Sequence, residues 1–202
     1  MNKLKIRLRD IWCRRVISNY YRWLLLIAGR THGVTISIGK NVYFFHRICL
    51  WGKGGKVIIE DHVTFAFDGG THWLGPVGID MRHPDAELRF ERDCIIMRAT
   101  RFVCFNRITI GEKSTIGDGC FMIDSDVHDF TPGAWEKPIK GKPIILGKRV
   151  HLAPDVTILK GVRLGDDTMV GNKSVVQRSF PKECVIAGNP ARLFLRHAAA
   201  SQ

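Results

Sequence analysis

The sequence lacks closely spaced cysteine pairs, a long apolar run and any nucleic-acid-binding motif. Its six cysteines form no Cys-x-x-Cys pair and no Cys/His cluster of the kind that holds structural zinc, which favours a reduced, cytoplasmic protein. No helix-turn-helix or RNP strand accompanies the formal net charge of +12, so we expect no nucleic-acid partner. A chain of 202 residues is long enough to bury one hydrophobic core in a single domain.

Acidic residues are nearly missing from the first 30 positions, where eight lysines and arginines accompany Asp10 alone. This arm therefore holds +7 of the net charge. Its apolar residues fall near helical spacing: Leu4, Leu8, Ile11, Trp12, Val16, Tyr20, Trp23 and Ile27. The pattern predicts a basic amphipathic α-helix over residues 1–30, with an apolar run too short to span a bilayer and no signal-peptide cleavage site. Two interpretations stay open: the helix packs on the protein or a neighbouring subunit, or it lies on an anionic membrane surface.

A six-residue repeat fills most of the remaining chain. From residue 146 it reads LGKRVH, LAPDVT, ILKGVR, LGDDTM and VGNKSV. The first position is aliphatic, the second is mostly glycine or alanine, and the fifth is valine, threonine or serine. The same phase appears at Ile110 and Ile116, and more faintly at Phe90. Similar units at Ile38 and Ile59 place the start of the repeat near residue 35.

This period predicts an all-β fold, a left-handed parallel β-helix in which three hexapeptides make one triangular coil. First-position side chains should stack inside the prism, each over its equivalent in the next coil. The expected pairs are Leu146 over Leu164, Leu152 over Val170, and Ile158 over Val176. The predicted organisation is the helix over 1–30, a hexapeptide-repeat solenoid over 31–190, and a short C-terminal tail over 191–202.

The other repeat positions carry their own expectations. The second position should lie at a corner, where glycine and small residues tolerate tight backbone geometry. The fifth position should place a small or β-branched side chain inside the prism. Because Cys94 and Cys120 occupy fifth positions, we interpret them as small core residues rather than reactive thiols.

The repeat stops between Met122 and Leu146. This stretch is rich in proline and glycine, with Pro132, Gly133, Pro138, Gly141 and Pro143, so it predicts an extruded loop over 123–145 instead of continuous strand. Loops carried on rigid scaffolds are common places for chemistry. Within this loop His128 lies among three carboxylates, Asp124, Asp126 and Asp129.

Three segments carry a specific resemblance: DSDVHDF, GKPIILGKRVHLAPDVTILKGVRLGDDTMVGNKSVV and the terminal AGNPARLF. In order and spacing they resemble the hexapeptide-repeat acyltransferases, which include galactoside and maltose O-acetyltransferases. The DSDxH form is most similar to members from O-antigen, capsule and exopolysaccharide gene clusters. The resemblance implies an acetyl-CoA-dependent O-acetyltransferase that modifies a sugar hydroxyl of a bacterial surface polysaccharide. It also implies a homotrimer, with coenzyme A held in a groove between adjacent solenoids.

Residue chemistry and the resemblance agree on His128 as the catalytic base. A neutral imidazole can take the proton of an acceptor hydroxyl during attack on a thioester. Asp126 is the candidate for orienting the ring, although spacing alone does not separate it from Asp124. The resemblance places the cofactor-binding positions at Pro154, Asn172, Gln177, Arg178 and Arg192. It implies no metal.

The chain departs from the family pattern at three places. His151 stands where the family usually has tryptophan, Ala153-Pro154 replaces a glycine-containing pair, and Asn172-Lys173 replaces a small pair. Because this region lines the cofactor in relatives, the detailed contacts with coenzyme A are left open.

Other functions fit the sequence less well. A γ-type carbonic anhydrase uses the same solenoid, but no two of the eight histidines have the five-residue separation that its zinc site needs. The alternatives left open are N-acetylation of an amino-sugar nucleotide, acetylation of an antibiotic, and a non-enzymatic solenoid scaffold. The expected location is the cytoplasm, where the basic arm could hold the protein at the inner face of the cell membrane.

Overall fold

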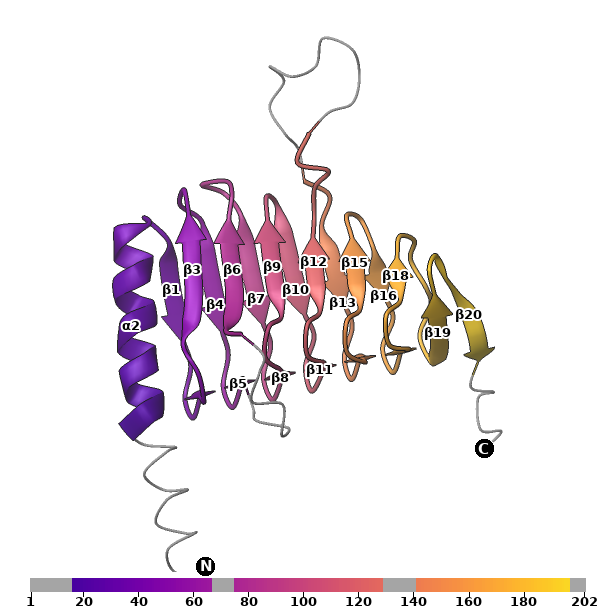
Figure 1. The fold of residues 1–202 in the computed structure, drawn as a ribbon, viewed down its shortest axis with the longest axis horizontal. Helices are drawn as coiled ribbons and strands as arrows, with labels where there is room; N and C mark the ends of the chain where they lie inside the picture. The colour runs from indigo at the N-terminus through magenta and orange to yellow at the C-terminus, as the bar shows by residue number, and fades with distance from the viewer. Residues whose placement is uncertain (1–15, 67–74, 129–140, 197–202) are drawn as a thin grey trace, which may run out of the picture.

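The computed structural model describes residues 16–66, 75–128 and 141–196 (Figure 1). These residues form one α-helix, α2 (Ser18–Thr31), and three sheets that wrap around a common core and are parallel except for the last strand. The chain passes through the three sheets in turn, which makes the left-handed parallel β-helix predicted from the repeat. The first 15 residues of the predicted N-terminal helix lie outside the described residues.

We name the sheets A, B and C in the order in which the chain enters them. Sheet A contains β1 (Thr35–Ile38), β4 (Lys56–Ile59), β7 (Glu87–Phe90), β10 (Arg107–Ile110), β13 (Ile144–Leu146) and β16 (Arg163–Leu164). Sheet B contains β2 (Tyr43–Phe44), β5 (Thr64–Phe65), β8 (Ile95–Ile96), β11 (Thr115–Ile116), β14 (His151–Leu152), β17 (Met169–Val170), β19 (Cys184–Gly188) and β20 (Ala191–Arg196). Sheet C contains β3 (Ile48–Gly52), β6 (Val77–Met81), β9 (Arg101–Cys104), β12 (Phe121–Ile123), β15 (Thr157–Leu159) and β18 (Val175–Val176).

The predicted register is confirmed. Leu146 pairs with Leu164, Leu152 with Val170, and Ile158 with Val176 in parallel ladders. All of these side chains are buried, as are the fifth-position residues from Val150 to Ser174. Stacking of apolar residues from coil to coil therefore forms one continuous core along the prism.

Cys94 and Cys120 are confirmed as core residues. The Cys94 thiol donates to the carbonyl of Gly111 at 3.1 Å, and the Cys120 thiol to the carbonyl of Ala153 at 3.3 Å. Burial raises the pKa of each thiol to about 12. Since the thiolate is the reactive form, neither side chain is suited to nucleophilic chemistry at neutral pH.

The corners differ from the expectation in one respect. Glycine at the second position is explained by close approach of the next coil, because an added Cβ on Gly111 would lie 2.3 Å from the carbonyl oxygen of Gly147. The left-handed backbone falls instead on the fourth position, mostly on residues other than glycine. These are Asn41, His62, Asp93, Ala99, Lys113, Arg149, Asp155, Asp167, Lys173 and Glu183. No sequence pattern marks this position, because its side chains share neither size nor charge.

The helix α2 closes the first coil of the solenoid. Leu25 and Gly29 are buried against it, and the helix packs on β1, β2 and β3 (Figure 1). The Ser18 hydroxyl accepts a hydrogen bond from the Phe44 backbone N–H at 3.0 Å. One face of the predicted amphipathic helix thus packs on the protein, as the first of the two interpretations expected.

At the other end the chain finishes as a hairpin. Residues 191–196, the beginning of the predicted C-terminal tail, form β20, which pairs antiparallel with β19. This strand continues sheet B beyond the last coil (Figure 1).

Candidate active site

The break in the repeat is an insertion at the corner between sheets C and A. In regular coils the paired residues Leu146 and Leu164 are 18 positions apart. Across the break the paired residues Ile110 and Leu146 are 36 positions apart, so the chain adds the length of one whole coil without adding a coil. The insertion leaves after β12 and returns at β13. The middle of the predicted loop, residues 129–140, lies outside the described residues.

Asp124 anchors the start of the insertion. Its side chain is buried, and its two carboxylate oxygens accept the backbone N–H groups of Phe105 and Asn106, each at 2.7 Å. Burial raises the pKa of Asp124, while these hydrogen bonds oppose that rise. With both oxygens engaged in this way, the carboxylate holds the backbone of the neighbouring turn.

The returning end of the insertion is tied to the same place. The Lys142 backbone N–H donates to the Asp124 carbonyl at 2.6 Å, and the Asn106 side-chain amide donates to the Gly141 carbonyl at 3.0 Å. The two ends therefore lie side by side on the turn between β9 and β10. This closes the solenoid beneath the inserted residues and fixes the points from which they start and return.

His128 and Asp126 lie on the exposed part of this insertion. The Asp126 carboxylate forms an ion pair with Lys160, which follows β15 at the same corner one coil further on. Val127, between Asp126 and His128 in the chain, has a φ of 66°. A β-branched residue in this region is strained, and such strain is concentrated at functional sites. This strained turn could not be predicted from the sequence. The orientation of His128 by Asp126 stays a prediction.

Four of the five predicted cofactor residues form two groups, one at each end of the strands of sheet C, and the fifth, Arg192, lies on β20 of sheet B. Gln177 and Arg178 follow β18 and lie at the C–A corner, which is the corner of His128. Pro154 and Asn172 lie at the B–C corner, stacked one coil apart. There the Pro154 carbonyl accepts the Lys173 backbone N–H at 3.1 Å. One chain thus does not bring all of these residues together.

Arg178 and Arg192 are both exposed. The Arg178 guanidinium lies over the Phe180 ring, 5.2 Å from the ring centroid, which is within the distance of a cation–π contact. Arg192 lies on β20 opposite Ala187 of β19. Each guanidinium has planar donors suited to a phosphate.

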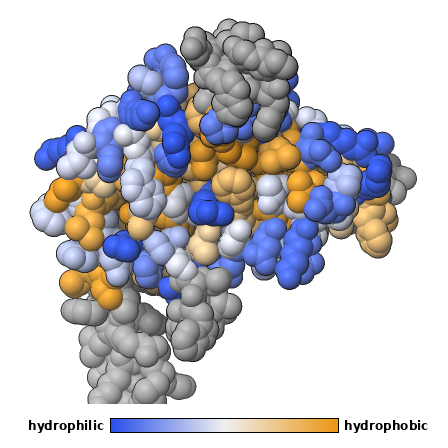
Figure 2. All heavy atoms as spheres, turned by 45° about the horizontal axis from the view of Figure 1, so that its top comes forward, coloured by the Kyte–Doolittle hydropathy of each residue, from blue (hydrophilic) through white to orange (hydrophobic). Residues whose placement is uncertain are grey.

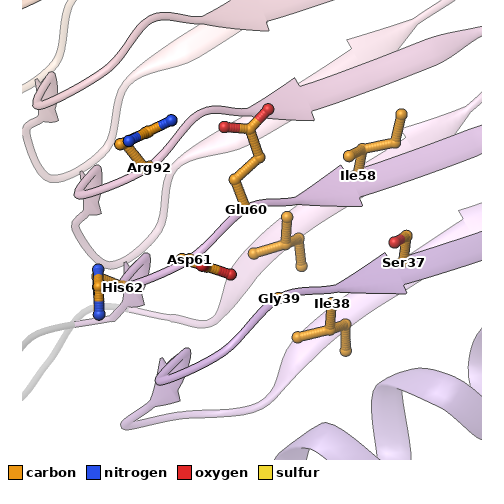
Figure 3. A pocket seen from close by; sticks show the side chains of 9 residues that line it. Ser37, Ile38, Gly39, Ile58, Glu60, Asp61, His62 and Arg92 are labelled. Carbon is orange, nitrogen blue, oxygen red and sulfur yellow. The ribbon is translucent and has the colours of Figure 1, made fainter.

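The surface hollows on the N-terminal coils include one at the A–B corner and two at the C–A corner. Figure 3 shows one of about 430 Å³ at the A–B corner, where Asp61, His62 and Arg92 surround the turn after β4. The Asp61 carboxylate already accepts a hydrogen bond from the Lys40 backbone N–H at 2.8 Å, and the His62 ring lies 3.4 Å from an Asp93 oxygen. One of the two at the C–A corner, of about 450 Å³, lies beside Trp51, Asp80 and Arg82. The first hollow is at a different corner from His128, so the insertion is the better candidate for chemistry.

Two further properties of the described residues bear on the site. Among residues 16–66, 75–128 and 141–196, no group of three or more histidine, cysteine or acidic side chains is arranged to hold a metal ion. Within the same ranges, no helix combines the length and apolar character that a membrane span requires.

Comparison with known proteins supports the resemblance seen in the sequence. The chain is 38% identical over 84 residues to WcaF of Escherichia coli, a protein named as a colanic acid biosynthesis acetyltransferase. This match covers 42% of the chain and 44% of that protein, so the chain spans less than half the length of this curated relative. No model of a protein family matches the chain.

Solved structures support the fold. The polysialic-acid-specific acetyltransferase NeuO has a TM-score of 0.59 and 22% identity, covering 84% of this chain and 85% of that one. The N-acyltransferase AntD from Bacillus cereus, solved with dTDP and coenzyme A, has a TM-score of 0.65 and 18% identity, covering 84% and 87%. In sequence and fold, therefore, the chain is similar to the hexapeptide-repeat acyltransferases.

Proposed function

We propose that the chain is an acetyl-CoA-dependent O-acetyltransferase acting on a sugar hydroxyl in the biosynthesis of a bacterial surface polysaccharide. The observation that carries this proposal is the insertion of one coil length at the C–A corner, anchored by Asp124 and bearing the exposed His128. The similarity to WcaF supports a polysaccharide as the acceptor.

In this proposal His128 works as a general base. Its imidazole takes the proton of the acceptor hydroxyl as that oxygen bonds to the thioester carbonyl carbon, and later returns the proton to the departing thiolate sulfur. Asp126, held at this corner by Lys160, stabilises the imidazolium while the proton is on the ring. Acetyl-CoA supplies the acetyl group as a co-substrate. No covalent enzyme intermediate is required.

We further propose that the protein works as a homotrimer. Gln177 and Arg178 lie at one corner of the prism, and Pro154 and Asn172 lie at another. A coenzyme A molecule placed between adjacent solenoids could contact one group on each chain, with Arg192 near its ribose phosphate. The closed ring would use heterologous contacts. Light scattering should give about three times 22.9 kDa, and an active monomer would rule out the shared groove.

The arm gives a separate proposal. The exposed face of α2 carries Tyr20, Trp23 and Ile27, and Val16, just before the helix, is also exposed. These residues repeat at helical spacing on the side away from the packed Leu25. Together with the basic residues before it, this face suits an anionic lipid surface. We therefore place the protein in the cytoplasm, peripheral to the inner face of the cell membrane.

N-acetylation is the main alternative, because the fold is shared with an N-acyltransferase as well as with a maltose O-acetyltransferase. A panel of acceptors tests the choice: colanic acid and polysialic acid fragments, an O-antigen preparation, amino-sugar nucleotides and an aminoglycoside. We expect thiol release from acetyl-CoA with a glycan and an alkali-labile ester in the product. Release only with amines would overturn the O-transfer proposal, and no release with any acceptor would favour a scaffold.

A further inference from the structure

The outer face of sheet C leads from the N-terminal coils directly to the insertion. In its parallel ladders Trp51 is opposite Asp80, Asp80 is opposite Val103, and Val103 is opposite Ile123. Partners in register point to the same side of a sheet, and the alternate residues of these strands are buried, so this row faces outward. Ile123 immediately precedes Asp124. The row therefore reaches the start of the His128 insertion at Ile123, and it continues beyond it to Leu159 of β15.

Trp51 is an unusual side chain in this row. It is 54% exposed, although large aromatic residues are normally placed where they bury most of their surface. It borders the hollow of about 450 Å³ at the C–A corner, together with Asp80 and Arg82. The negative face of an indole ring attracts the slightly positive C–H groups of a sugar ring, so an exposed tryptophan beside polar groups suits a pyranose.

The polar groups beside Trp51 are held in place. Arg82 directs both Nε and Nη2 to one oxygen of Asp80, at 2.7 and 2.6 Å. The other Asp80 oxygen takes no part in this ion pair, and the contact with Arg82 fixes the direction in which it points. A carboxylate oxygen accepts hydrogen bonds from sugar hydroxyls, and guanidinium N–H groups donate to them.

A second outward row of sheet C carries one charged side chain, Arg101, beside the insertion. Arg101 is opposite Gly78 on one side and Phe121 on the other. Its Cγ lies over Gly78, where an added Cβ would be 3.3 Å away, and its guanidinium lies 5.0 Å from the centroid of the Phe121 ring. The absent side chain at Gly78 and the cation–π contact together keep Arg101 along the face. Figure 2 shows apolar side chains gathered over the middle strands, with hydrophilic ones on either side.

We propose that this outer face of sheet C, from Trp51 through Asp80, Arg82 and Arg101 to the insertion, binds an oligosaccharide acceptor. The inference rests on the proposed function. Three strand steps of about 4.8 Å separate Trp51 from Ile123, or about 14 Å in all. A single sugar at His128 cannot span that distance, whereas an oligosaccharide lying across β3, β6, β9 and β12 can (Figure 1). Trp51 is thus a specificity determinant for chain length and takes no part in the chemistry.

The test compares acceptor lengths in the Trp51→Ala variant. The best glycan acceptor of the panel is supplied as a monosaccharide and as short and long oligosaccharides. We expect the KM for the long acceptor to rise about tenfold, the equivalent of about 1.4 kcal/mol, with kcat and the KM for the monosaccharide unchanged. Trp51→Phe should retain most of the affinity for the long acceptor. Trp23→Ala is the matched control, because Trp23 is 58% exposed on a different element.

Two results would overturn the subsite. One is an equal change in KM for short and long acceptors, and the other is a changed mass in light scattering, which would make Trp51 a subunit contact. Calorimetry of the long oligosaccharide with the wild-type protein and Trp51→Ala separates this inference from the proposed function. Binding that weakens in the variant supports the subsite even if no acetyl group is transferred, and equal binding by both proteins contradicts it even if transfer occurs.

Discussion

Asp124 and Asp126 are two residues apart and have different roles. Asp124 is buried under the turn between β9 and β10 and satisfies two backbone N–H groups, whereas Asp126 is exposed and paired with Lys160. An isolated motif cannot distinguish them, because the burial of Asp124 depends on a turn almost 20 residues earlier. The role of Asp124 in holding the insertion follows only from that contact.

The first prediction compares Asp124→Asn with Asp126→Asn. An asparagine at 124 offers one acceptor oxygen where two backbone N–H groups point, so one of them loses its partner. We expect a loss of about 1–3 kcal/mol in the free energy of unfolding, measured with urea. At the exposed position 126 the loss should be below about 1 kcal/mol.

The pH dependence gives an independent check on Asp124. Its folded pKa is raised, so its ionisation favours the unfolded chain, and stability falls as pH rises from the ordinary pKa of 3.8 towards the folded value. The Asp124→Asn variant should lose this part of the pH profile. Equal stability of both variants at every pH would mean that Asp124 is not the anchor.

At the scale of the coils, the repeat could be predicted because each hexapeptide packs against the core in the same way. Leu, Ile and Val at the first position must face inward in every coil, so the register of β13 with β16 follows directly from the spacing. The left-handed fourth position could not be predicted, since it is a backbone property that residues as different as Lys113 and Asp155 share. The hairpin of β19 and β20 also carries no hexapeptide signal.

The second prediction concerns the glycine column. Gly111→Ala would place a methyl group 2.3 Å from the Gly147 carbonyl oxygen, and this neighbour is backbone that cannot move without separating the coils. We expect a loss of about 1–3 kcal/mol, seen as a lower midpoint in thermal unfolding. Gly75→Ala is the control, because no atom lies within 4 Å of its added Cβ. Similar midpoints for the two variants would contradict the close-approach explanation.

At the scale of the whole molecule, α2 has two faces with separate surroundings. Leu25 and Gly29 pack on the first coil, and the stripe from Val16 to Ile27 is exposed. The sequence predicted an amphipathic helix but left its partner open, because the same residues suit a protein or a lipid surface. The structure shows that α2 itself covers the core. Deleting the helix would therefore remove both its packing on the first coil and its proposed contact with lipid, so substitutions on the outer face are needed instead.

The third prediction is therefore made on that face. The full chain should sediment with vesicles containing anionic lipid and dissociate as salt rises, since basic residues near such a surface contribute about 1 kcal/mol each. Replacing Tyr20 and Trp23 by serine should weaken sedimentation without lowering thermal stability. Trp51→Ser serves as the control for loss of an exposed tryptophan. Unchanged sedimentation of the double variant would rule out insertion of this face into the lipid surface.

The role of His128 is the central claim, and one measurement tests it most directly. His128→Ala is compared with the wild-type protein for acetyl transfer from acetyl-CoA to the best glycan acceptor, with coenzyme A affinity measured on the same samples by calorimetry. Loss of a positioned general base should lower kcat by about 100- to 10,000-fold and leave coenzyme A affinity nearly unchanged. Turnover close to that of the wild-type protein would show that His128 is not the base.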